Sequence, residues 1–109
     1  MTDQDRTAQV WSLLVLAAHN QKILSYDNVQ KLTGIPQQGV TKFLVTIQAY
    51  CEHHRLPPLT SICVNELTGM PSESLMEAKE IFGAQARVFV FDWFACRAPT
   101  PEEFQKFAT

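Results

Sequence analysis

The stretch that decides the fold is Ser25 to His54, SYDNVQKLTGIPQQGVTKFLVTIQAYCEHH. Its first part predicts a short helix. Ser25 suits the N-cap, Asp27 lies in the first turn where the helix dipole favours an acid, and Gly34 follows the last turn. The inward side of this helix is expected to carry Val29 and Leu32.

A longer helix is predicted after the turn at 34–36. Pro36 can begin it, because the first turn of a helix needs no amide donor. Apolar side chains then recur at i, i+3, i+4 and i+7, the strongest helical period in the sequence. The residues on this stripe, expected in the core, are Val40, Phe43, Leu44, Ile47, Tyr50, Cys51 and His54. A short helix, a glycine turn and a longer amphipathic helix indicate a helix-turn-helix.

The segments on either side extend this pattern. Residues 5–19 predict a largely buried first helix that ends at Asn20. After the break at 56–58, the β-favouring residues 59–65 predict an extended segment, followed by a turn at 66–69 and a short return at Met70-Pro71. Such a strand and return are typical of the β-wing of a winged helix.

The C-terminal third predicts further helices. Ser74-Leu75-Met76-Glu77 is a capping box that predicts a helix through Phe82. Residues 86–94 fit both a helix and a strand, and we favour the helix. A final short helix carrying Phe104 and Phe107 is also predicted. Thr100 suits its N-cap, Pro101 its first position, and Glu103 completes a capping box.

The predicted fold class is therefore mainly α with a short β-wing, a winged helix-turn-helix plus C-terminal helices, in one domain spanning residues 1–109. The 109 residues are 46% hydrophobic, and a domain of this size buries about two-thirds of its unfolded surface without disulfide or metal. The apolar run Leu13 to Ala18 is far shorter than the roughly 20 residues that span a bilayer. Asp3, Asp5 and Arg6 precede it instead of a basic leader. We expect a cytoplasmic protein with no membrane contact.

The charge is unevenly distributed along a chain whose formal net charge is −2. Between Asn20 and Arg55 the balance is +2, and between Glu66 and Thr109 it is −3. A free-standing, high-affinity DNA-binding protein normally carries a basic stripe, because phosphate neutralisation supplies most of its non-specific affinity. Any nucleic-acid contact is therefore expected to be weak, or to need an oligomer or a positively charged partner.

The stretch Ile23 to Gly69 resembles the winged-helix DNA-binding domain of the alkylguanine-DNA alkyltransferases and the alkyltransferase-like proteins. The matching pieces are Ser25-Tyr26 at the start of the first helix of the motif, Gly34 with Pro36 in the turn, Leu56-Pro57-Pro58, and the turn glycine Gly69. The resemblance covers under half of the chain. It implies a winged-helix scaffold that contacts DNA.

The functional residues of that family are not present. Alkyl transfer uses a Pro-Cys-His-Arg motif, whereas Cys63 here is preceded by Ile62 and followed by Val64. The family also places an arginine at the start of the third helix, beside a flipped base. The corresponding residues of this sequence are Gln37, Gln38 and Gly39. We therefore expect the scaffold without alkyltransferase activity, and no other catalytic motif is visible. The chain is predicted not to be an enzyme.

The polar side of the early third helix carries the candidate nucleic-acid contacts. Glutamine can bond adenine at two atoms, and lysine can reach a phosphate or guanine. Together with the predicted wing, the candidate nucleic-acid-binding residues are Gln37, Gln38, Thr41, Lys42, Asn65 and Thr68. The alternative is an ordinary solvated helix face, and the sequence weighs the two about equally.

Two other clusters have a structural and a functional interpretation. Cys51 and His54 share a helix face, and His19 could join them on a metal; we favour core packing, because no second ligand pair exists. The three cysteines lack a Cys-x-x-Cys pair and are expected to be free thiols, so no metal or other cofactor is predicted. Aromatic residues gather near Trp93, where an exposed remainder would mark a protein interface or homodimer contact.

The sequence is compatible with two alternative functions. The first is a small cytoplasmic winged-helix module that binds nucleic acid or regulates through its third helix and wing. The second is a protein-interaction or dimerisation module that keeps the scaffold and has lost nucleic-acid affinity. The missing basic stripe favours the second, and the Gln-Gln-Thr-Lys side of the third helix favours the first.

Overall fold

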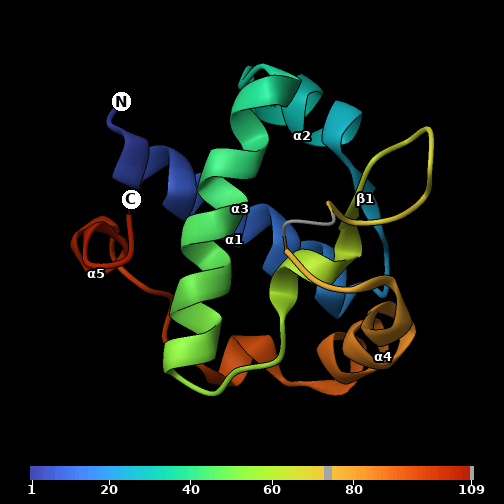
Figure 1. Ribbon diagram of the computed structural model, residues 1–109. Helices are drawn as coiled ribbons and strands as arrows, with labels where there is room; N and C mark the ends of the chain where they lie inside the picture. Colours follow the sequence, from blue (N-terminus) through green and yellow to red (C-terminus); the bar gives the residue numbers. More distant parts are fainter. Residues whose placement is uncertain (73–74, 109) are drawn as a thin grey trace.

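The computed structural model describes residues 1–72 and 75–108. The chain is mainly helical, with one small two-stranded sheet. Two 17-residue helices form its centre, and shorter elements surround them (Figure 1). In chain order these elements are α1 (Asp3–His19), β1 (Leu24–Ser25), α2 (Tyr26–Thr33), α3 (Gln37–His53), η1 (Leu59–Ile62), β2 (Cys63–Val64), η2 (Ala78–Glu80), α4 (Ile81–Val90), η3 (Trp93–Ala95) and α5 (Pro101–Gln105), where η marks a 3-10 helix.

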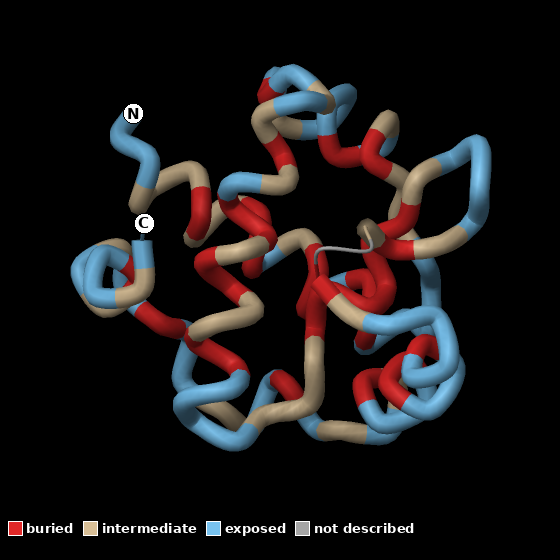
Figure 2. The backbone as a smooth tube through the Cα atoms, in the orientation of Figure 1, coloured by how far each residue is buried: buried red, intermediate tan, exposed pale blue. Residues whose placement is uncertain are grey.

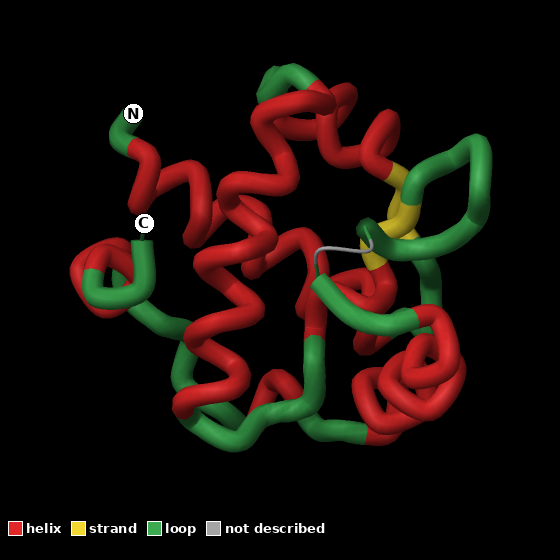
Figure 3. The backbone as a smooth tube through the Cα atoms, viewed as in Figure 1, coloured by secondary structure: helices red, strands yellow, loops and turns green. Residues whose placement is uncertain are grey.

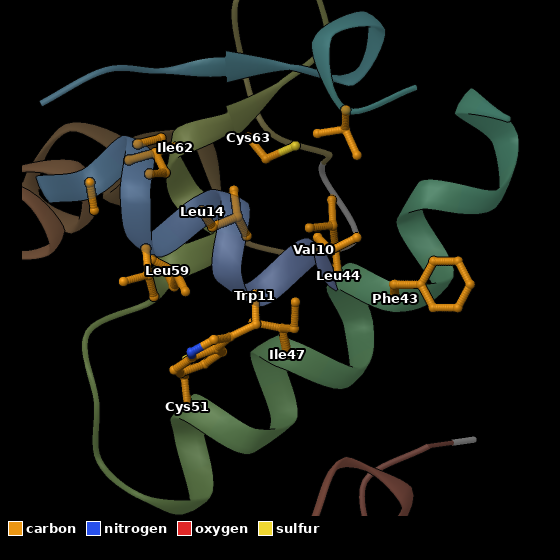
Figure 4. Packing of buried hydrophobic residues seen from close by; sticks show 14 of the residues in the cluster. Val10, Trp11, Leu14, Phe43, Leu44, Ile47, Cys51, Leu59, Ile62 and Cys63 are labelled. Atoms are coloured by element: carbon orange, nitrogen blue, oxygen red, sulfur yellow. The ribbon is translucent and has the colours of Figure 1, made fainter. Parts of the chain in front are cut away.

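The core lies where α1, α3 and η1 meet (Figure 4). Leu14 of α1, Leu44 and Ile47 of α3, and Leu59 and Ile62 of η1 are all fully buried. This confirms the predicted apolar stripe of the third helix at its centre. The short helix α5 packs against α1 and also contacts α3, which closes the opposite side of the core.

The predicted caps of α2 are confirmed. The Ser25 hydroxyl accepts a hydrogen bond from the Asn28 amide at 3.0 Å, and the Asn28 side chain accepts one from the Ser25 amide at 3.0 Å. Gly34 ends the helix in the left-handed conformation, φ 79°, which L side chains rarely adopt. The predicted first helix and its end at Asn20 are also confirmed.

Two predicted burial positions are wrong. Leu32 is 61% exposed, because the two-turn helix α2 buries Tyr26 and Val29, and Leu32 lies to one side of that face. His54 is exposed rather than in the core, since α3 ends at His53 and His54 is its C-cap. Its ring lies on that of Tyr50, with centroids 4.2 Å apart.

The predicted extended segment 59–65 is largely a 3-10 helix, and only Cys63–Val64 forms a strand. That strand pairs in parallel with Leu24–Ser25, which the sequence did not predict as a strand (Figure 3). The predicted return at Met70-Pro71 is not a strand. The Asn65 amide donates to the Met70 carbonyl at 2.9 Å, which closes a turn, and Pro71 has no amide to continue a ladder.

The C-terminal helices differ from prediction in their bounds. Ser74 lies outside the described residues, and 75–77 are not helical, because Glu77 has an extended backbone and precedes η2. The predicted helix at 86–94 is correct as far as Val90, where Phe91 turns extended and ends α4. The predicted final helix is confirmed, with a Thr100–Glu103 capping box and Pro101 in its first turn.

Candidate nucleic-acid interface

The candidate interface centres on the turn between α2 and α3. The left-handed Gly34 and then Pro36 reverse the chain between the two helices. Pro36 makes no side-chain capping hydrogen bond to the 17-residue helix α3, and the Gly39 amide donates instead to the Pro36 carbonyl at 2.8 Å. A helix start of this kind carries a partial positive charge that favours an anion such as phosphate.

The six candidate residues differ in how far they are exposed. Gln38 and Lys42 on α3 are exposed, and so is Thr68 in the loop that follows β2. The other three, partly buried, are Gln37, Thr41 and Asn65. Figure 2 shows the α2–α3 turn and the loop at 65–70 as mostly exposed segments on the upper side of the molecule.

Lys42 is not a free cation. Its ammonium group pairs with the carboxylate of Asp3 in the first turn of α1, and both side chains remain more than half exposed. Gln37 donates a hydrogen bond to Asp27 at 3.4 Å, and Asp27 also pairs with Lys31 at 2.8 Å. The two lysines of α2 and α3 therefore each have an acidic partner, which lowers the positive potential of this surface.

Thr41 and Lys42 lie on different sides of α3. Lys42 lines a pocket of about 290 Å³ with Asp3, Arg6 and the α2–α3 turn. Thr41 instead lies beside the buried hydroxyl of Tyr26, whose burial raises its pKa. Of these two candidate residues, Lys42 therefore lies toward α1, and Thr41 lies toward α2.

The loop residues form a separate group. Asn65 accepts a hydrogen bond from the Leu67 amide at 2.8 Å, and the Thr68 hydroxyl accepts one from the Met70 amide at 3.1 Å. Gly69 adopts φ 70°, which the tight turn requires. Asn65 and Thr68 line another pocket of about 290 Å³ with residues that precede and begin α4, including Met76 and Ile81.

Arg6 belongs to the candidate interface although the sequence did not point to it. Its guanidinium donates to the carbonyl of Thr33 at 2.7 Å, at the end of α2, and to Gln9 at 3.1 Å. It lines the same pocket as Lys42. The contact joins residues 27 apart in sequence, so no local pattern could have shown it.

The cysteines do not form a reactive centre. Burial raises the pKa of Cys51 and of Cys63 to about 12, and no cationic neighbour opposes this effect on Cys63. Since the thiolate is the nucleophile, both groups remain protonated at neutral pH. Cys96 is the partly exposed thiol.

We predict that iodoacetamide labels only Cys96 in the native protein between pH 7 and about 9. Incubation with alkylated duplex DNA is expected to add no mass to Cys63. Both results are read by peptide mass spectrometry, and the urea-unfolded chain, in which all three thiols react, is the control. A stoichiometric alkyl group on Cys63 of the folded protein would contradict the assignment of a non-reactive thiol.

The same two thiols predict how stability depends on pH. In the unfolded chain they ionise near the ordinary value of 9.0, whereas in the folded protein they keep their protons to about 12. The unfolded state therefore releases protons first as the pH rises. The free energy of unfolding is expected to fall above about pH 9, measured by urea titration at several pH values.

In the described part of the chain, no three histidine, cysteine or acidic side chains are grouped to hold a metal ion. Among these same residues, no helix is long and apolar enough to cross a bilayer. The chain matches no family model, and neither a curated protein nor a solved structure is significantly similar to it.

Proposed function

We propose that the chain is a small non-catalytic winged-helix protein of the cytoplasm that binds nucleic acid weakly through the start of α3, with the loop at 65–68 as its wing. The observation that carries this proposal is the pair α2 and α3 joined by the Gly34–Pro36 turn, with an α3 start that has no side-chain cap. Gln38 and Lys42 are exposed there. Their side chains suit base edges and phosphates.

The charge of this surface limits the expected affinity. Lys31 and Lys42 are both paired with acids, and Arg6 is already bonded to the Thr33 carbonyl. One chain can therefore neutralise only a few phosphates. Each neutralised phosphate contributes about −0.9 to the slope of log affinity against log salt, so the slope is expected to be about −2 to −4.

Fluorescence polarisation with a random-sequence duplex tests the proposal. Raising the salt threefold, from about 50 to about 150 mM, is expected to weaken binding roughly 10- to 80-fold. The same titration with single-stranded DNA shows which form is preferred. Absence of binding to either nucleic acid at the lower salt would reject the proposal.

The Asp3–Lys42 ion pair gives a sharper prediction. An Asp3→Asn substitution removes the competitor of a phosphate for Lys42, so affinity at low salt is expected to rise by up to about fivefold, which corresponds to the roughly 0.2–1 kcal/mol of an exposed ion pair. Polarisation titrations of the variant and the wild type at the same low salt measure the change in affinity.

Asp92→Asn is the matched control, because Asp92 is an exposed acid after α4 and the change in net charge is the same. If the two variants gain affinity equally, the effect comes from net charge, and Lys42 is not the contact.

A protein-interaction module is the second candidate function. Several large apolar side chains outside the candidate nucleic-acid interface are exposed: Leu16 is 52% exposed, Phe82 76%, Val90 83% and Phe94 57%. Exposed apolar surface on a small protein commonly marks a contact with another protein.

A further inference from the structure

An apolar slot opens between α1 and the C-terminal segment that contains η3. Its volume is about 170 Å³, and Trp11, Val15, Trp93, Phe94 and Cys96 contribute to its walls. The two indole rings meet edge to face, with centroids 5.8 Å apart at 84°. Trp93 also donates its indole N–H to the Val88 carbonyl at 2.9 Å. The buried indoles are therefore held in place and leave a preformed apolar recess.

Large apolar side chains stand exposed at the same face. Phe94 is itself a wall of the slot and is 57% exposed. Its ring lies 4.5 Å from that of His19, at the end of α1. One turn before His19, Leu16 is 52% exposed. Projecting apolar groups and an apolar recess thus occur on one face of one chain.

Charge is sparse in the two segments that line the slot, where Asp92, the residue before η3, is an exposed acid. From Thr7 to Gln21 the sequence contains no aspartate, glutamate, lysine or arginine, so the solvent-facing side of α1 at Ser12 and Leu16 is uncharged. Arg97, which follows Cys96, is neutralised by Glu103 at 2.8 Å. Depletion of charged residues is the compositional mark of the centre of a protein interface.

We propose that this face binds a second copy of the same chain, with Phe94 of each copy entering the slot of the other. A two-fold contact uses the same patch on both partners, so it requires a projecting group and a recess on one face, as found here. A second copy presents a sparsely charged face, and two such faces meet with less of the like-charge repulsion expected elsewhere between chains of net charge −2. This dimer would give the protein-interaction module, the second candidate function, a defined surface and a defined partner.

An interface of standard size would cover about an eighth of the surface of this chain. A stable interface covers about 800 Å² on each partner, compared with a total accessible surface of 6246 Å² for this chain. Interfaces of that area range from micromolar to much tighter affinity. A dimer would also double the number of phosphate contacts available to the α3 surface.

Sedimentation equilibrium between about 1 and 100 µM, the range in which a weak interface dissociates, tests the proposal. The wild type is expected to dimerise, and Phe94→Glu and Leu16→Glu are each expected to weaken the dimer at least tenfold. Both side chains are exposed, so melting temperatures are expected to stay near that of the wild type. Phe82→Glu on α4, another exposed phenylalanine, is the control that should leave the dimer intact.

Cys96 gives an independent measurement, because it lines the slot whereas Cys51 and Cys63 are buried. Its rate of iodoacetamide labelling is expected to fall as protein concentration rises, and to become independent of concentration in Phe94→Glu. A monomer at 100 µM, or a dimer that Phe82→Glu disrupts and Phe94→Glu does not, would overturn the proposal. Neither outcome would affect nucleic-acid binding by the monomer.

Discussion

Replacing Phe104 by alanine is expected to lower the free energy of unfolding by about 3–5 kcal/mol. Phe104 is fully buried, and its ring packs between those of Trp11 on α1 and Tyr50 on α3, at centroid distances of 5.8 and 5.4 Å. It is the buried residue of the five-residue helix α5. Its loss would leave a cavity and detach α5 from both long helices.

This loss is a large share of the roughly 5–15 kcal/mol that stabilises a small domain. Urea unfolding followed by tryptophan fluorescence measures it, because Trp11 and Trp93 are both buried. Phe82→Ala removes the same ring from a position that is 76% exposed and is expected to change stability by less than about 0.5 kcal/mol. If both variants unfold at the same urea concentration, the placement of α5 against the core is wrong.

Charge reversal at Lys42 is expected to abolish measurable nucleic-acid binding. The substitution Lys42→Glu removes the exposed cation of the early α3 surface and places a second acid beside Asp3. Its effect on stability is expected to be within about 1 kcal/mol, because the ion pair it breaks is exposed. Polarisation titration and a melting curve on the same sample separate loss of binding from loss of fold.

Lys79→Glu is the matched control for Lys42→Glu. Lys79 lies in η2, its side chain is 79% exposed, and it pairs with Glu77. The net charge changes by the same amount in the two variants. Equal loss of affinity in both would show that binding depends on overall charge and not on the α3 surface.

The features predicted well from the sequence are those fixed by neighbouring residues. Ser25 and Gly34 set the ends of α2 through hydrogen bonds within a few residues, and the apolar period of α3 alone determines which side enters the core. The same locality explains the Thr100–Glu103 capping box of α5.

The features that were missed depend on contacts between distant segments. The two-residue strands exist only because Leu24 pairs with Cys63 across the fold, and neither strand is long enough to show a period of two. The ion pair of Lys42 joins residues 39 apart, so the sequence could not show that this candidate contact has an acidic partner. For the candidate interface, the local pattern therefore proposed the residues, and the tertiary fold determined which of them have acidic partners.

Chemical-shift mapping tests the central claim most directly. A ¹⁵N-labelled sample is titrated with a random-sequence duplex at low salt, and the backbone amide shifts are followed. The shifts are expected to cluster at Gln37, Gln38, Thr41 and Lys42, with smaller changes at Asn65 and Thr68. Shifts confined to the α1–η3 face around Phe94, or no shifts at any residue, would contradict nucleic-acid binding at the start of α3.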